Sequence, residues 1–186
     1  PHFTVWDYSL RNCEAFRQIG VSNVVHVPVG YVPEMARIQP APEQDIDVLF
    51  YGQVDERRGK ILEGLKQAGL KVQILQKIYG AERDQYIARS RIVLNMHLYE
   101  TRIFEIVRVS YLLANSKAIV SEYTPQTEIE ADLLDALVLS EYDELISACI
   151  DLVRDPDQRQ AYETRGFEIM SARDECQYLR SALRRP

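Results

Sequence analysis

Short hydrophobic runs alternate with longer amphipathic stretches through the middle of the chain. Five of these runs have the length of a buried strand and lie at residues 47–51, 71–75, 91–95, 117–121 and 136–139. Stretches with apolar residues at helical spacing separate the first four runs and cover residues 55–68, 80–90 and 101–115. Strands that alternate with helices in this way are typical of βαβ units. The pattern therefore predicts an α/β fold, with a Rossmann-like parallel sheet of about five strands and helices on both faces.

The two ends of the chain extend beyond this regular pattern. Residues 7–19 predict a helix and residues 23–27 a short strand, while the polar residues 36–45 carry two prolines and predict a linker. Three closing helices are predicted at residues 142–154, 156–171 and 173–184. We therefore predict three parts, namely residues 1–45, 46–154 and 155–186. Because the chain begins with Pro1 rather than Met, we also expect it to be a piece of a longer protein.

Composition argues against several classes of partner. The formal net charge is −6, so no general attraction to nucleic acid or to an anionic membrane is expected. No apolar run reaches the roughly 18 residues of a membrane-spanning helix, and no secretory signal is visible. Cys13, Cys149 and Cys176 lack metal-ligand spacing, so reduced thiols in a cytoplasm are the expected state.

The first candidate binding segment follows the run at residues 47–51. Gly52 stands at the expected turn between strand and helix, where a glycine lets the backbone approach a ligand closely. The next helix offers free N–H groups to an anion at its amino end, and Arg57 or Arg58 would add a phosphate contact. Neither a GxGxxG motif nor a P-loop motif is present. A basic first turn that is merely solvated remains the alternative.

The second candidate segment follows the run at residues 91–95. His97, Glu100 and Arg102 come directly after a strand that is expected to be buried, at the edge where open α/β sheets bind ligands. Glu105 lies within the predicted helix, with Arg102 and Arg108 at a spacing of three residues on the same face. Two interpretations of Glu105 are open, a structural ion pair and a carboxylate for the hydroxyl groups of a sugar. A hydrogen-bonded structural histidine is the corresponding alternative for His97.

Two further classes of site have no support in the sequence. Only His2 and His26 remain as histidine partners for His97, and neither stands at metal-ligand spacing from it, so no metal site is predicted. No serine or cysteine has histidine and acidic partners at a convincing spacing, so covalent catalysis is not predicted either.

Two segments resemble a known family. DVLFYGQVDERR at 47–58 and HLYETRIFEIVRVSYLLANSKAIVSE at 97–122 are similar to the second domain of GT-B glycosyltransferases, of the group-1 type that includes spore-maturation-like proteins. The resemblance implies one half of a GT-B fold. It assigns the turn beside the phosphates to Gly52, their charge partner to Arg57 or Arg58, and the ribose-binding carboxylate to Glu105. It also implies that His97, Glu100 and Arg102 line the donor cleft, with His97 and Glu100 as the catalytic candidates.

The same resemblance implies a function and its limits. The donor substrate would be a nucleotide-diphospho-sugar, used without a metal or other cofactor, and the acceptor is unknown. Residues 1–45 would be the tail of a preceding domain and the interdomain linker, and residues 155–186 would pack back across the cleft. The chain is then expected to be inactive without an amino-terminal acceptor domain. The alternative is a non-catalytic Rossmann-like interaction module that derives from a glycosyltransferase and forms homo-oligomers.

Overall fold

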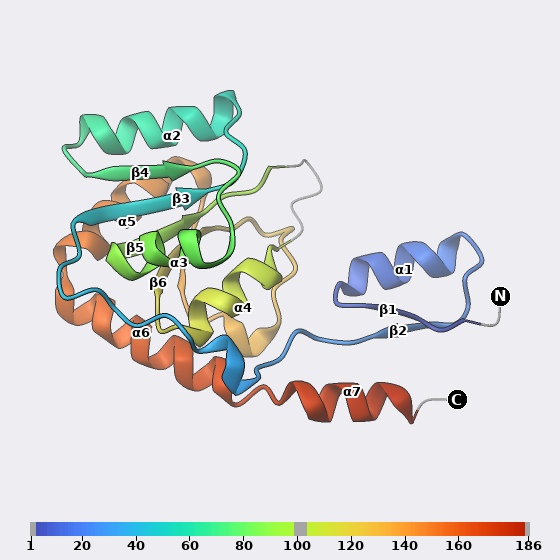
Figure 1. Ribbon diagram of the computed structural model, residues 1–186. Helices are drawn as coiled ribbons and strands as arrows, with labels where there is room; N and C mark the ends of the chain where they lie inside the picture. Colours follow the sequence, from blue (N-terminus) through green and yellow to red (C-terminus); the bar gives the residue numbers. More distant parts are fainter. Residues whose placement is uncertain (1–2, 99–103, 185–186) are drawn as a thin grey trace.

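The computed structural model describes residues 3–98 and 104–184 of the chain, and its centre is a five-stranded parallel sheet. The strand order is β4-β3-β5-β6-β7 (Figure 1). The strands are β3 (Ile46–Tyr51), β4 (Val72–Leu75), β5 (Ser90–Asn95), β6 (Ala118–Glu122) and β7 (Val138–Ser140). The central strands read as continuous apolar runs because both of their faces are covered. The predicted α/β fold with a five-stranded parallel sheet is confirmed.

Helices pack on both faces of this sheet. They are α2 (Glu56–Gln67), α3 (Gly80–Arg89), α4 (Ile106–Ala114), α5 (Leu145–Arg154) and α6 (Pro156–Ser171). Neighbouring residues of a strand point to opposite faces, so Val48 and Phe50 pack with residues of α2 and α5. Leu49 packs on the other face, in the cluster that includes residues of α3, α4 and α6. Two apolar cores therefore hold the sheet between two helical layers.

A small second sheet lies beside this unit. It pairs β1 (Val5–Asp7) with β2 (Val24–His26) in parallel, and α1 (Leu10–Gln18) connects the two strands. The last helix, α7 (Glu175–Leu183), continues from the end of α6 and lies along β2 (Figure 1). Val25 and Val27 pack against Ala182 of this helix. The carboxyl-terminal helices thus connect the large sheet to the small one.

Gly30 allows the chain after β2 to approach the start of α7. A Cβ atom on Gly30 would lie 2.7 Å from the backbone of Glu175, closer than real contacts permit. The Gly30 N–H donates to the Glu175 carboxylate at 2.6 Å. Tyr31 forms an isolated bridge with Asp174 next to this contact. The junction of α6 and α7 is therefore tied directly to the segment that follows the small sheet.

One strand and one helix boundary differ from the predictions. Strand β1 was not predicted, because three residues, Val5, Trp6 and Asp7, make no hydrophobic run. Helix α4 was predicted from residue 101, but among the described residues it begins at Ile106, since the backbone of Glu105 has ψ 59, outside the helical region. Glu105 is therefore the N-cap of α4 and not a residue within the helix. Short 3-10 turns also occur at Pro33–Met35, Ala131–Leu133 and Tyr142–Glu144.

No helix in the described part of the chain is long and apolar enough to cross a membrane.

A buried lysine at the start of β6 predicts a pH-dependent stability. Burial lowers the pKa of Lys117 to about 8 from an ordinary value of 10.5, and its ammonium donates to the Ser90 carbonyl at 2.5 Å. The folded chain therefore binds fewer protons than the unfolded chain between these two pH values, so this group makes stability rise with pH. Relative to Lys117→Met, the natural chain is expected to gain about 2 kcal/mol in unfolding free energy between pH 8 and 10.

Urea unfolding at several pH values measures this difference. Lys71→Met is the matched control, because Lys71 is exposed. A natural chain whose stability runs parallel to that of Lys117→Met across this pH range would contradict the prediction.

Candidate functional site

The carboxyl ends of β3, β5 and β6 bring polar side chains together at one edge of the sheet. The Asn95 amide at the end of β5 donates to the Ser121 hydroxyl of β6 at 3.0 Å. The His97 backbone N–H donates to the Glu122 carboxylate at 3.0 Å. The guanidinium of Arg58, from the first turn of α2, donates to the Met96 carbonyl. Parallel strands align their carboxyl ends, which explains why residues so far apart in the sequence meet here.

Gly52 lies next to two guanidinium groups. Its φ of +139° lies in a region that side chains rarely adopt. A Cβ atom at this position would lie 3.4 Å from Nη2 of Arg108 and 3.9 Å from Nη1 of Arg58. The end of β3 therefore presents bare backbone next to two cations.

Arg58 is buried at this edge and not solvated. Its side chain is 2% exposed, and it donates to the Gln53 carbonyl at 2.8 Å as well as to Met96. The Glu105 carboxylate lies 3.4 Å from its Nη2 atom. Burial lowers the pKa of Arg58, and the nearby Glu105 raises it in part. Because burial outweighs the effect of the neighbouring carboxylates on this pKa, an anionic ligand beside Arg58 would stabilise its charge.

Arg57 points to a different partner although it precedes Arg58 directly. It forms a two-pronged ion pair with Glu122, with Nη1 2.9 Å from Oε2. The Arg57 guanidinium lies 3.8 Å from the centre of the Tyr142 ring. The Tyr142 hydroxyl donates to the backbone carbonyl of Arg57 at 2.7 Å. Adjacent residues on a helix are separated by about 100°, so only Arg58 faces Gly52.

Glu105 joins the two cations beside Gly52. Its Oε2 atom lies 2.9 Å from Nη1 of Arg108, and its Oε1 atom faces Arg58. Arg108 also donates to the Asn95 amide oxygen at 3.0 Å. The ion pair that the sequence left open as an interpretation of Glu105 is thus present, and the carboxylate is still 27% exposed. Glu100 and Arg102 lie outside the described residues.

Glu122 fixes the backbone of the loop that follows β5. It is almost fully buried. Burial alone would raise the pKa of Glu122. Hydrogen bonds from Arg57 and from the His97 N–H outweigh this effect, so the pKa lies below its ordinary value. His97 is also buried, and its Nε2 atom lies 3.3 Å from the Thr127 hydroxyl. His97 therefore occupies the candidate edge as part of a hydrogen-bonded network.

A hollow of about 320 Å³ opens next to Gly52. Its lining residues are Tyr8, Tyr51, Arg83, Glu105, Val107, Arg108 and Tyr111. The Arg83 guanidinium lies between two aromatic rings, 5.5 Å from the centre of Tyr51 and 4.8 Å from that of Tyr111. Arg108 lies 4.8 Å from the Tyr51 ring centre. Two cations and three tyrosines in one hollow suit a ligand that combines phosphate with a planar ring.

Sequence reasoning did not identify Arg83 and Tyr51 as site residues. Tyr51 is the last residue of β3, and Arg83 lies in the first turn of α3, the helix that follows β4, so both lie near the carboxyl end of a strand. This position near a strand end is the sequence feature that could have identified both residues as site candidates. Within the described residues, no group of three or more histidine, cysteine or acidic side chains is arranged to hold a metal ion.

Solved structures share the fold of this chain over nearly its whole length. TarM of S. aureus superposes with a TM-score of 0.68 at 13% identity, over 97% of this chain and 42% of its own. Anabaena HepE, solved with UDP-glucose, has a TM-score of 0.68 at 14% identity, over 97% of this chain and 62% of its own. WaaG, a glycosyltransferase of lipopolysaccharide biosynthesis, reaches 0.67 at 9% identity, over 95% and 61%. The chain has the Rossmann-like fold of the GT-B glycosyltransferases.

Relatives at the level of sequence come from Acanthamoeba polyphaga mimivirus. The uncharacterized protein L140 is 31% identical over 140 residues, which are 72% of this chain and 44% of L140. The uncharacterized protein R358 is 30% identical over 158 residues, which are 83% of this chain and 54% of R358. The chain thus spans about half the length of these relatives. No family model matches it.

Proposed function

We propose that this chain is the carboxyl-terminal, donor-binding half of a glycosyltransferase of the group-1, spore-maturation-like type. The observation that carries the proposal is the meeting of Arg58, Arg108 and Glu105 beside the bare backbone of Gly52. Two cations at the carboxyl edge of a parallel sheet suit a diphosphate, and a partly exposed carboxylate beside them suits sugar hydroxyls. HepE, which shares the fold, was solved with UDP and with UDP-glucose.

Each residue has a role in this proposal. Arg58 and Arg108 neutralise the diphosphate, which becomes the leaving group when the sugar is transferred. Glu105 binds the ribose, and His97 lines the donor cleft together with Glu100 and Arg102. Fixed cations stabilise a developing negative charge without the cost of solvent reorganisation, so they supply the charge that a metal ion supplies in other transferases. The nucleotide-diphospho-sugar is thus the donor substrate, with no separate cofactor.

Free thiols favour a cytoplasmic setting for this reaction. Cys13, Cys149 and Cys176 are all unpaired, as expected in a reducing compartment. Transfer also needs an acceptor, which this proposal assigns mainly to the other half of the enzyme. Residues 1–45 would then belong to the end of that half and to the linker.

Isothermal titration calorimetry with UDP, GDP and uridine tests the proposal. We expect saturable binding of UDP or GDP and binding of uridine that is weaker by at least about tenfold, because each lost charge-assisted hydrogen bond to phosphate costs about 1.5–3 kcal/mol.

Equal affinity for UDP and uridine would contradict the diphosphate site. A chain that binds none of these nucleotides but forms dimers in light scattering would instead fit the non-catalytic interaction module. The exposed side chains of Phe3, Ile19 and Leu183 would supply apolar contacts in that case.

A further inference from the structure

The segment that connects the two sheets, residues 27–45, is tied to α4, the helix that begins beside the proposed donor site. The segment runs past α4 on its way to β3 (Figure 1). The side-chain oxygen of Asn115, just after the end of α4, accepts the backbone N–H groups of Arg37 and Ile38 at 2.9 and 2.8 Å. The side-chain nitrogen of Asn115 donates to the Met35 carbonyl at 2.8 Å. The backbone of Arg37 is therefore held in place against this helix.

The Arg37 side chain reaches a carboxylate that also binds a residue of the hollow beside Gly52. Its Nη2 atom lies 3.1 Å from Oδ2 of Asp84 in α3, and its Nε atom donates to the Tyr111 hydroxyl at 2.9 Å. The Tyr111 hydroxyl donates to the same Asp84 oxygen at 2.8 Å. The other oxygen of Asp84, Oδ1, accepts from Nη2 of Arg83 at 3.0 Å. One carboxylate therefore joins Arg37 of the connecting segment to Arg83 of the hollow.

Arg83 uses only part of the hydrogen-bonding capacity of its guanidinium. Its Nη2 atom donates to Asp84, and Arg83 makes no other hydrogen bond within the described part of the chain. Its Nε atom is buried without an acceptor. Buried N–H groups without a partner cost free energy and are rare in native proteins. A ligand that supplies an acceptor to Arg83 would lower that cost.

The charges at this hollow select an anion. Among the described residues, the charged side chains that line it are those of Arg83, Glu105 and Arg108. The ion pairs at the hollow involve four cations and only two carboxylates, namely Arg37, Arg58, Arg83 and Arg108 with Asp84 and Glu105. This excess of positive charge favours an anionic ligand. Phosphate accepts charge-assisted hydrogen bonds from a guanidinium, so a diphosphate suits the remaining N–H groups of Arg83.

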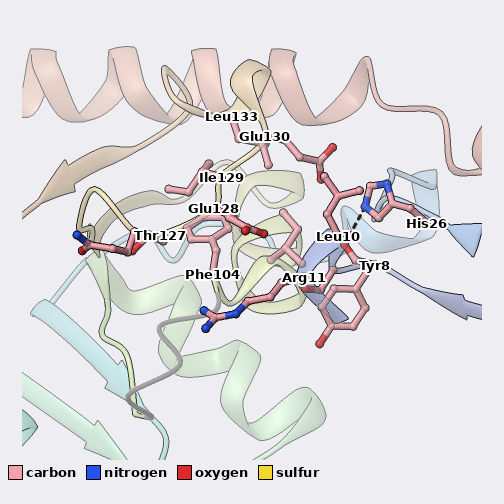
Figure 2. A pocket seen from close by; sticks show the side chains of 13 residues that line it. Tyr8, Leu10, Arg11, His26, Phe104, Thr127, Glu128, Ile129, Glu130 and Leu133 are labelled. Carbon is pink, nitrogen blue, oxygen red and sulfur yellow. Dashed lines mark hydrogen bonds between the residues drawn. The ribbon is translucent and has the colours of Figure 1, made fainter. Parts of the chain in front are cut away.

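The neighbouring cavity, between the small sheet and the large one, makes no such selection. It has a volume of about 330 Å³, with Tyr8 to Arg11 on one side and residues 126–130 on the other (Figure 2). Arg11 brings a cation to its lining, whereas Glu128 and Glu130 bring carboxylates. Of the two, the hollow beside Gly52 is therefore the one whose charge selects an anion.

Arg37 acts on Arg83 through the carboxylate that they share. Arg37 and Tyr111 contact Oδ2 of Asp84, and Arg83 contacts Oδ1. Without the Arg37 cation, Oδ2 has room for a second N–H group of Arg83, and two-pronged pairs between arginine and carboxylate are strong. Such a pair would draw Arg83 toward Asp84 and compete with a phosphate in the hollow.

We propose that Arg83 is a further residue that binds the donor nucleotide, and that Asp84 and Arg37 are positioning residues that act through it. The connecting segment then controls how tightly the nucleotide binds, because it carries Arg37. The inference rests on the proposed function, since the diphosphate at the edge of the large sheet is the anion that Arg83 would contact.

Calorimetric titration of the full chain with UDP, in a double-mutant cycle, tests this inference. Arg83→Met is expected to weaken binding by about 10- to 150-fold, as the loss of a charge-assisted hydrogen bond to phosphate does. Arg37→Met is expected to weaken it by about three- to tenfold, a typical coupling within one ion-pair network. In the Arg83→Met background, Arg37→Met is expected to change the affinity by less than about twofold. An equal effect of Arg37→Met in both backgrounds would overturn the inference.

Arg89→Met is the matched control. Arg89 also joins α3 to the connecting segment, since its Nε atom donates to Asp45 at 2.8 Å, but it lies at the other end of α3 from Arg83. Its substitution is expected to keep UDP affinity within about twofold. Arg37 and Arg89 are 56% and 46% exposed, so both substitutions are compatible with folding.

Arg37→Lys supplies a further check on the positioning role. Lysine keeps a cation that can donate to Asp84, so this variant is expected to recover most of the affinity that Arg37→Met loses. No recovery in Arg37→Lys, or equal losses in Arg37→Met and Arg89→Met, would show that Arg37 does not act through Asp84 and would refute the inference.

Arg108→Met separates the inference from the proposed function. If UDP binds and Arg108→Met weakens it while Arg83→Met and Arg37→Met do not, the role of Arg83 and of the connecting segment is refuted and the proposed function stands. If the natural chain binds neither UDP nor GDP, the proposed function and the inference are refuted together.

Discussion

Replacing Arg173 by methionine is expected to lower the unfolding free energy by about 3 kcal/mol. The Arg173 side chain is 3% exposed, and its guanidinium contacts Asp132 at 2.6 Å, Glu130 at 2.8 Å and the Val29 carbonyl at 3.1 Å. Its own carbonyl accepts the Tyr31 N–H at 2.5 Å. Removing one partner of a buried ion pair costs about 3–5 kcal/mol. The low end applies because both carboxylates keep some access to water.

Urea unfolding of the two chains at neutral pH measures this loss. Arg180→Met is the control, because Arg180 is an exposed arginine on α7, the helix that begins shortly after Arg173. Its substitution is expected to change stability by less than about 0.5 kcal/mol. Equal losses in the two variants would show that the Arg173 network does not stabilise the junction between the two sheets.

The arrangement of the large sheet was predictable because each strand and helix carries its own signal. Runs such as Val48 to Tyr51 and Ile92 to Leu94 are apolar throughout, as strands buried on both faces require. Once the strands are parallel, a residue that directly follows one of them lies at the carboxyl edge. This reasoning placed Gly52 and His97 at one edge without knowledge of any contact between them.

What the sequence did not predict depends on contacts between distant segments. The ion-pair partners of Arg57 and Arg58 are Glu122 and Glu105, which lie 65 and 47 residues further along the chain. Arg83 joins the site through the rings of Tyr51 and Tyr111, and no local pattern marks that stacking.

The start of the helix at Glu105 also could not be predicted from the local sequence pattern. Apolar residues recur at helical spacing from residue 104 onward. The simplest prediction is therefore a helix that begins at about residue 101 and includes Glu105. In the structure the backbone of Glu105 is not helical. Arg58 and Arg108, which both form ion pairs with the Glu105 side chain, lie beside it. The cavity that residues 8–11 and 126–130 line was likewise not predictable, because these two segments lie more than a hundred residues apart in the sequence.

Arg108→Met is expected to weaken UDP binding by about 10- to 150-fold. Arg108 is 17% exposed, lies next to Gly52 and lines the hollow with Tyr51 and Arg83. A charge-assisted hydrogen bond to phosphate contributes about 1.5–3 kcal/mol, which corresponds to this range in Kd. Methionine keeps an unbranched apolar stem at this position while removing the charge. Calorimetry at low and constant salt measures the change, because salt screens this contribution.

Arg91→Met is the matched control. Arg91 also pairs with a carboxylate, that of Asp47 at 2.8 Å, but both residues lie at the amino ends of their strands, opposite the proposed site. UDP affinity is therefore expected to remain within about twofold of the natural value, since long-range effects of one exposed charge are small. Similar losses in both variants would point to a general dependence on net charge. A loss confined to Arg108→Met would place the diphosphate at the carboxyl edge, where Glu105 is within reach of the attached ribose.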